Sequence, residues 1–198
     1  MATGRLCSLG NDEPKETDLS QELVDRLRAG DAAALDEVIA LHGREVKAVA
    51  YTILRNEADA DEVAEDTFVT AWLKIGSLRD ARALRSWLLK VASRLALRLA
   101  TRQQAVPLGS ADPLGASPDQ STAIIDRIAL DAALRALPPG MRAVIALHYV
   151  ADLSVDQVAK TLGRSRNTVK SQLRHALHNM RDSLALDQTT TRTAEVVR

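Results

Sequence analysis

The stretch LSVDQVAKTLGRSRNTVKSQLRHALHNM, residues 153–180, predicts two helices joined by a glycine turn. Ser154 can cap the first helix, and Gln157 lies three residues later, which is the spacing of a capping box. Gly163 follows the last apolar residue of this helix, where a residue with positive φ often ends a helix. Ser165 can cap a second helix two residues further on. The stretch therefore predicts a helix-turn-helix with a very short turn.

Charge indicates what the second helix does. Apolar residues recur at helical spacing between Val169 and Met180 and predict one buried face. From Arg164 to Arg181 there are basic side chains and no acidic one, and Arg or Asn near a helix start can form paired hydrogen bonds with base edges in the major groove. Two amphipathic helices around a glycine also occur in helical bundles, which is the alternative interpretation. The candidate DNA-contacting residues are Arg164, Arg166, Asn167, Lys170, Ser171 and Arg174.

Composition limits the fold and the chemistry. The chain has 198 residues, of which 46% are hydrophobic and only 3% aromatic, and helix formers dominate without an alternating strand pattern. We expect an all-α protein of two small helical domains. Cys7 is the single cysteine, so there is no internal disulfide, and no Cys/His cluster has metal-ligand spacing, so neither a metal nor a cofactor is expected. No apolar run approaches membrane-spanning length and no signal peptide is evident, which predicts a cytoplasmic protein without membrane insertion.

The expected helices divide the chain into two domains with a linker between them. In the first domain, residues 18–102, Gly30 and Gly43 mark expected helix ends, and the helix from residue 84 onward is expected to be the longest. Residues 103–121 contain three prolines and two glycines without periodicity, which predicts a linker. Fully extended, such a linker spans at most about 63–68 Å. The second domain covers residues 122–186, and disordered tails are expected at 1–17 and 187–198.

The net charge is zero, but the charges are separated along the chain. Residues 11–66 have about ten more acidic than basic side chains, and residues 79–102 have about six more basic than acidic ones. Acidic residues crowd the first half of the helix expected at 58–74. Such acids also complement a helix dipole, so docking onto a basic partner is one of two explanations. The candidate partner-binding residues are Asp61, Glu62, Glu65, Asp66, Phe68 and Trp72.

A row of like charges follows on the next helix. Lys90, Arg94, Arg98 and Arg102 stand four residues apart, and each like-charge neighbour costs an isolated helix roughly 0.2–0.5 kcal/mol. A merely solvated helix would gain from interleaved glutamates, so contact with a phosphate backbone is the favoured explanation. The candidate residues of this second nucleic-acid surface are Arg79, Arg82, Arg85, Lys90, Arg94, Arg98 and Arg102.

Two blocks of the sequence, one on each side of the expected linker, resemble one family. Residues 137–150, 153–159 and 168–176 are similar to region four of the extracytoplasmic-function sigma factors of bacterial RNA polymerase. Residues 59–72 resemble region 2.2 of that family, and residues 78–92 resemble its regions 2.3 and 2.4. The region-four pattern alone is shared with other helix-turn-helix regulators, whereas both blocks in this order with a linker between them are highly specific.

The resemblance implies the partners core RNA polymerase and promoter DNA. It implies that Glu65, Asp66, Phe68 and Trp72 belong to a surface that docks on the polymerase clamp. It further implies that residues 79–102 hold the melted minus-ten strand. Arg166, Asn167, Lys170 and Arg174 would then bind the minus-thirty-five element. An anti-sigma factor is a further partner that the resemblance allows.

The chain departs from the usual sequence pattern of this family at two places, and two other functional classes are alternatives to a sigma factor. Many members carry Arg-Asn where this chain has Ser93 and Arg94, and Asp where it has Arg98, which leaves the preferred minus-ten bases open. A stand-alone helix-turn-helix regulator would explain residues 122–186 but would leave residues 59–102 without a task. A helical enzyme is not expected, because the four histidines have no nucleophile partner at recognisable spacing.

Overall fold

Helices make up nearly all of the part of the chain that the structure describes. The computed structural model describes residues 16–105 and 122–196, and these ranges contain no strand, which confirms the all-α class. The α-helices are α1 (Glu16–Arg28), α2 (Ala32–Leu54), α3 (Glu57–Lys74), α4 (Leu84–Ala105), α5 (Thr122–Arg135), α6 (Pro139–Ile145), α7 (Val155–Leu162) and α8 (Arg166–Val196). Short 3-10 turns lie at Ile75–Ser77 and Ala81–Ala83, and a π turn lies at Ala146–Val150.

The capping residues act as the sequence predicts. The Ser154 side chain accepts a hydrogen bond from Gln157 N, and the Gln157 side chain accepts one from Ser154 N, so both bonds of the capping box are present. Gly163 has φ +63°, a conformation that glycine adopts without steric cost, and it ends α7. Thr168 N donates to Ser165 Oγ at 3.0 Å at the start of α8. The helix-turn-helix is therefore confirmed in its local geometry.

The prediction that a helix ends at Gly43 is wrong, because α2 runs through this residue from Ala32 to Leu54. Glycine inside a helix costs roughly 0.5–1 kcal/mol relative to alanine. The apolar face of α2 continues on both sides of the glycine, however, with Val38, Val46 and Val49 all fully buried. This packing keeps the helix continuous.

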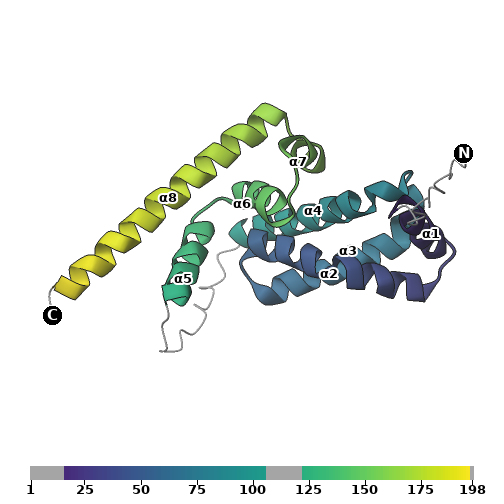
Figure 1. Cartoon of the computed structure of the whole chain (residues 1–198), viewed down its shortest axis with the longest axis horizontal. Coiled ribbons are helices and arrows are strands. Elements are labelled where there is room, and N and C mark those ends of the chain that lie inside the picture. The colour runs from purple at the N-terminus through teal and green to yellow at the C-terminus, as the bar shows by residue number, and fades with distance from the viewer. Residues whose placement is uncertain (1–15, 106–121, 197–198) are drawn as a thin grey trace, which may run out of the picture.

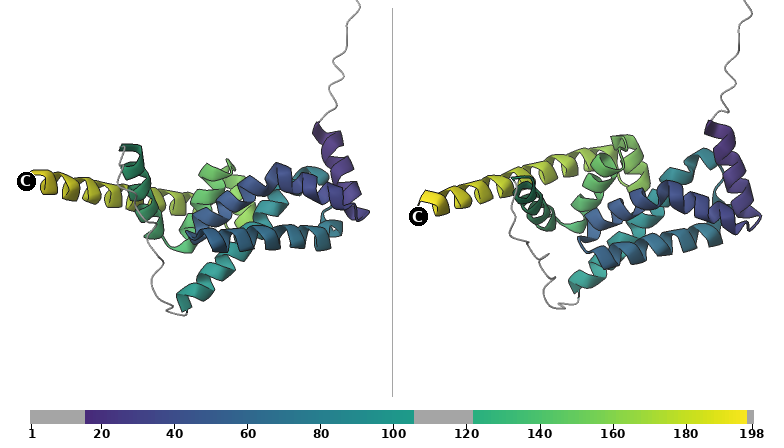
Figure 2. Two further views of the ribbon diagram at one scale, coloured as in Figure 1. Left: turned by 90° about the horizontal axis from the view of Figure 1, so that it is seen from below. Right: turned by 60° about the horizontal axis from the view of Figure 1, so that its bottom comes forward.

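The longest helix is α8, with 31 residues, and not α4, with 22. The sequence predicted disorder from residue 187, whereas the α8 backbone continues to Val196. Residues 164–198 contain neither glycine nor proline, so nothing in this part of the sequence forces the helix to stop. Figures 1 and 2 show that α8 extends away from the other helices.

Most of the predicted linker and of the predicted N-terminal tail lies outside the described residues. Residues 103–105 belong to α4, and Glu16 and Thr17 belong to α1. The domain boundaries therefore stay predictions.

One apolar core crosses from the first half of the chain to the second. Val49 and Ile53 of α2 and Leu89 of α4 lie in the same buried cluster as Leu147 and Val158 of the second half. A separate cluster lies within the first half alone, among α1, α2, α3 and α4. The helix-turn-helix half consequently packs directly on α2 and α4 (Figure 1).

Candidate nucleic-acid and protein-binding surfaces

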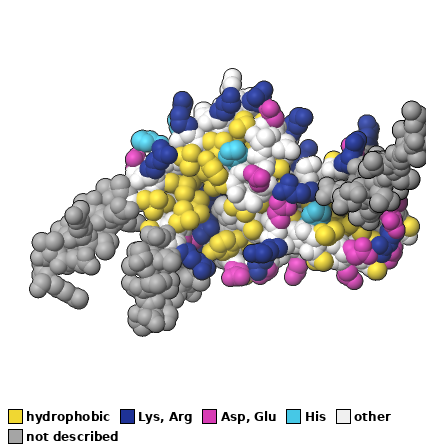
Figure 3. All heavy atoms as spheres, viewed as in Figure 1, with side chains coloured by type: hydrophobic (Ala, Val, Ile, Leu, Met, Phe, Trp, Pro, Cys, Tyr) yellow, Lys and Arg dark blue, Asp and Glu magenta, His cyan; other side chains and the backbone are white. Residues whose placement is uncertain are grey.

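The recognition helix presents its polar side chains to solvent. Val169, Leu173 and Ala176 anchor α8 in the core with exposed fractions of 8% or less, which fixes the opposite face outward. On that face Arg166, Asn167, Lys170 and Arg174 are exposed, and Ser171 is half-buried. Figure 3 shows Lys and Arg side chains gathered along the edge formed by α7 and the start of α8. The helix can thus offer donors to a major groove without moving its core side chains.

Two arginines of the predicted set already have partners within the protein. Arg164 is half-buried and donates through Nη1 to Gly140 O at 3.1 Å and to Gln172 Oε1 at 2.7 Å, so it ties α6 to α8. Arg166 is exposed and forms an ion pair with Asp156 of α7 at 2.5 Å. Arg164 is therefore better described as a positioning residue of the helix-turn-helix, whereas Arg166 remains accessible to DNA.

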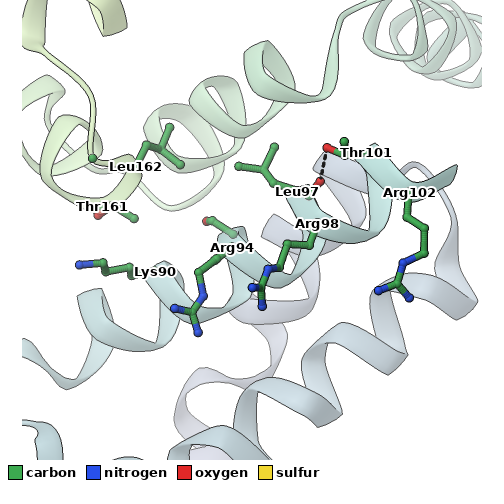
Figure 4. A pocket seen from close by; sticks show the side chains of 10 residues that line it. Lys90, Arg94, Leu97, Arg98, Thr101, Arg102, Thr161 and Leu162 are labelled. Atoms are coloured by element: carbon green, nitrogen blue, oxygen red, sulfur yellow. Dashed lines mark hydrogen bonds between the residues drawn. The ribbon is translucent and has the colours of Figure 1, made fainter. Parts of the chain in front are cut away.

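The basic row on α4 is continuous and accessible. Lys90, Arg94, Arg98 and Arg102 are all exposed. Figure 4 shows that Arg94, Arg98 and Arg102 extend in one direction from α4, whereas Leu97 points toward Leu162 of α7. The same face borders a groove of about 680 Å³, and Thr161 and Leu162 of α7, with Gly163 directly after this helix, line its other side. The sequence did not indicate that α7 would lie beside this row.

The three arginines that precede the row differ from one another. Arg79 is exposed. Arg82 is exposed and pairs with Asp80 at 3.1 Å, and this hydrogen-bonded carboxylate raises the pKa of the arginine. Arg85 is half-buried and donates to Glu45 and to Ala151 O, so its guanidinium already has partners within the protein.

Three acidic residues of α3 lie on its solvent-exposed side. Asn56 caps this helix by accepting a hydrogen bond from Asp59 N at 3.2 Å, which fixes the start of the acidic segment. Glu62, Glu65 and Asp66 are exposed. Asp61 instead forms an ion pair with Lys47 of α2 at 2.7 Å. The hydrogen bond to Asp61 raises the pKa of Lys47, and the hydrogen bond to Glu57 is the second cause.

An apolar groove beside these acids was not foreseen. It has a volume of about 660 Å³ and lies between α2 and α3, with Phe68 and Trp72 in its lining. Phe68 is itself 6% exposed and belongs to the core, so its role is to support the groove. Ile39, Val69 and Leu73 border the groove with exposed fractions of 40%, 56% and 72%. The signal in the sequence is that Val69 and Leu73 stand four residues apart, off the core face of α3.

Two kinds of site do not occur in the described part of the chain. Residues 16–105 and 122–196 hold no group of three or more His, Cys, Asp or Glu side chains placed to bind a metal ion. Among the helices described, none combines the length and apolar character needed to cross a membrane.

The chain combines a helix-turn-helix that has a basic recognition helix with a second basic helix and a separate acidic face. This combination is typical of a helical DNA-binding protein. Two family models match the chain: Sigma-70 region 2 over residues 38–106, and Sigma-70, region 4 over residues 127–180. The chain belongs to the sigma-70 family, among the ECF RNA polymerase sigma factors.

Individual relatives agree with this assignment. The ECF RNA polymerase sigma factor SigL of Mycobacterium tuberculosis is 32% identical over 163 residues, which cover 79% of this chain and 92% of SigL. SigM of the same species is 29% identical over 148 residues, covering 75% and 76% of the two chains.

Solved structures show the same fold. CnrH, determined in complex with the cytosolic domain of CnrY, has a TM-score of 0.65 at 24% identity, covering 85% of this chain and 98% of CnrH. The sigma factor RpoE of Bartonella quintana, determined with the anti-sigma factor NepR, has a TM-score of 0.55 at 22% identity, covering 86% and 99%.

Proposed function

We propose that this sigma factor binds core RNA polymerase and directs promoter-specific transcription initiation through two separate DNA-binding surfaces. The observation that carries the proposal is the pairing of an exposed basic row on α4 with an exposed basic face on α8. The stand-alone regulator is not favoured, because it leaves the row on α4 and the acidic side of α3 unexplained. A location in the cytoplasm, with the polymerase and the DNA, belongs to the proposal.

The proposed minus-thirty-five contacts are made by α8. Arg166, Asn167, Lys170 and Arg174 are exposed on one face, and their side chains can donate to base edges or to phosphates of duplex DNA. Ser171 and Arg164 stand closer to the protein, and Arg164 acts by holding α8 against α6.

The proposed minus-ten surface is the row on α4 together with Arg79 and Arg82. Exposed guanidinium groups four residues apart form a cationic track, which is what binding of a melted strand requires. Arg85 is left out of this surface, because its guanidinium bonds within the protein.

Polymerase docking is assigned to the outer side of α3. Glu62, Glu65 and Asp66 supply exposed negative charge, and Val69 and Leu73 supply exposed apolar area beside it. An interface with an apolar centre and charged surroundings is typical of protein association. An anti-sigma factor is a second partner in this proposal, because any protein that covers α3 excludes the polymerase from it.

The separation of roles can be tested with templates that differ only in strand pairing. Arg174→Ala should weaken initiation on duplex and on pre-melted templates alike, because the upstream element is duplex in both. Arg94→Ala with Arg98→Ala should weaken initiation by roughly tenfold or more on duplex templates, and a pre-melted bubble should restore most of it. Run-off transcription with core polymerase measures both variants. Equal rescue of the two by the bubble would contradict the separation.

A further inference from the structure

Arg166 and Asp156 form an ion pair between the two helices of the helix-turn-helix. Asp156 lies in the first turn of α7, where the capping box at Ser154 fixes the start of the helix. Arg166 is the first residue of α8 and directly follows Ser165, which caps that helix. The Nε atom of Arg166 lies 2.5 Å from Oδ1 of Asp156. Both helix starts are capped, so the backbone that carries each charge has a defined position.

The pair is exposed to solvent and adds little to the stability of the fold. The side chains of Arg166 and Asp156 are 63% and 50% exposed. Water and salt screen an ion pair at this exposure, so its attraction is weak. The helix dipole also disfavours a cation in the first turn of a helix, which is where Arg166 lies. The position of this arginine therefore points to a partner outside the protein.

The contact with Asp156 leaves the outer edge of the guanidinium available. Arginine has five N–H donors, and the closest contact with the carboxylate is made by Nε, at the inner edge of the group. The terminal amino groups, Nη1 and Nη2, lie at the far end of the side chain. Two such donors match N7 and O6 of one guanine, which is the commonest specific contact in a major groove.

A side chain that is oriented before binding recognises a base at a lower entropic cost. A free arginine populates many rotamers, and fixing it in one of them on DNA costs conformational entropy. The carboxylate of Asp156 restricts the guanidinium in advance through a charged contact. The N-terminal residues of a recognition helix are those that contact base edges, and Arg166 is the first residue of α8.

Asp156 also has a cost for DNA binding. The segment from Arg164 to Arg181 contains no acidic side chain, and the ion pair brings one carboxylate to the start of this basic segment. A carboxylate beside a DNA-binding surface repels phosphates and lowers the affinity for every sequence. Such a cost is expected where discrimination between sequences is gained.

We propose that Asp156 is a positioning residue that orients Arg166 for the recognition of one guanine in the upstream promoter element. The proposal rests on the proposed function of α8, to which it adds the base, the donor groups and the second residue. It implies that Asp156 lowers the general affinity for DNA and raises the preference for that guanine.

Promoter binding by the holoenzyme tests this role. The full-length chain is combined with core polymerase, and affinities are measured for fragments in which each base pair of the preferred upstream element is replaced in turn. Arg166→Ala should lower the preference for guanine at one base pair by about fivefold or more. Asp156→Asn should lose most of the preference at the same base pair, while the affinity for fragments without that guanine stays the same or rises.

Asp152→Asn is the matched control for the change of charge. Asp152 is exposed and lies just before α7. Its substitution should change the affinity for all fragments alike and keep the guanine preference of the parent. A purely structural role of Asp156 at the start of α7 predicts a different result for Asp156→Asn: a lower melting temperature and an equal loss of affinity on every fragment.

A double variant shows whether Asp156 acts through Arg166. In the Arg166→Ala background, Asp156→Asn should cause no further change of preference at that base pair. A further change there would overturn the positioning role, and so would an equal loss on every fragment or an unchanged preference in Arg166→Ala. A parent preference that persists in Asp156→Asn would contradict the role of Asp156 alone. A parent holoenzyme without any base preference in the upstream element would contradict the proposed function of α8 as well.

Discussion

At the scale of single residues, arginine serves three different purposes in this protein. Arg94 and Arg98 are exposed and available to phosphate. Arg164 holds the helix-turn-helix together, and Arg85 and Arg142 join the two halves of the chain. The sequence shows the charge of each arginine but not its partner, because Arg142 binds a carbonyl 89 residues away. For the same reason the sequence could not show that Arg85 bonds to Glu45 and to Ala151 O.

His42 should make the stability of the protein depend on pH. Burial lowers its pKa from the usual value of 6.5, with nearby Arg85 acting in the same direction and Glu45 opposing it. The unfolded chain therefore binds a proton more readily than the folded one, so stability is present above pH 6.5 and is lost as the pH falls through the lower folded pKa.

Thermal unfolding at about pH 7.5 and pH 5.5 measures this effect. The parent should lose more stability on acidification than His42→Gln, whereas His175→Gln, which removes an exposed histidine of α8, should behave like the parent. Identical pH dependence in the parent and in His42→Gln would contradict the assignment.

At the scale of elements, local signals were reliable wherever the structure is decided locally. The capping box at Ser154, the glycine turn at Gly163 and the acidic start of α3 all lie where the sequence predicts them. The end of α2 was misplaced, because buried valines on both sides of Gly43 outweigh the helix-breaking tendency of one glycine. Packing between distant elements decided the outcome there.

The acidic side of α3 can be tested by charge reversal. Glu65→Lys with Asp66→Lys should lower affinity for core polymerase by roughly tenfold or more, because attraction to a basic partner becomes repulsion. Both side chains are exposed, so folding should be unaffected. Co-purification at moderate salt is the measurement, with Glu22→Lys and Asp182→Lys as a control of equal charge change at exposed positions. Undiminished binding would show that the polymerase docks elsewhere.

At the scale of the whole molecule, the sequence predicted the class of the parts but not their arrangement. Helical periodicity, separated charges and the two sigma-like blocks indicated two helical units that bind DNA. The shared core that joins Ile53 and Leu89 to Leu147 and Val158 was not predictable, because apolar periodicity shows that a face is buried but not which element covers it. The packing of the helix-turn-helix half on α2 and α4 follows from that core.

Reconstituted transcription tests the central claim most directly. The purified chain is combined with core RNA polymerase and a library of promoter fragments, and the start sites of the transcripts are determined. The account predicts initiation at a defined subset of fragments that share an upstream and a downstream element at constant spacing, with no such starts from core polymerase alone. Specific binding of duplex DNA by the chain without polymerase, combined with no added start sites, would contradict it.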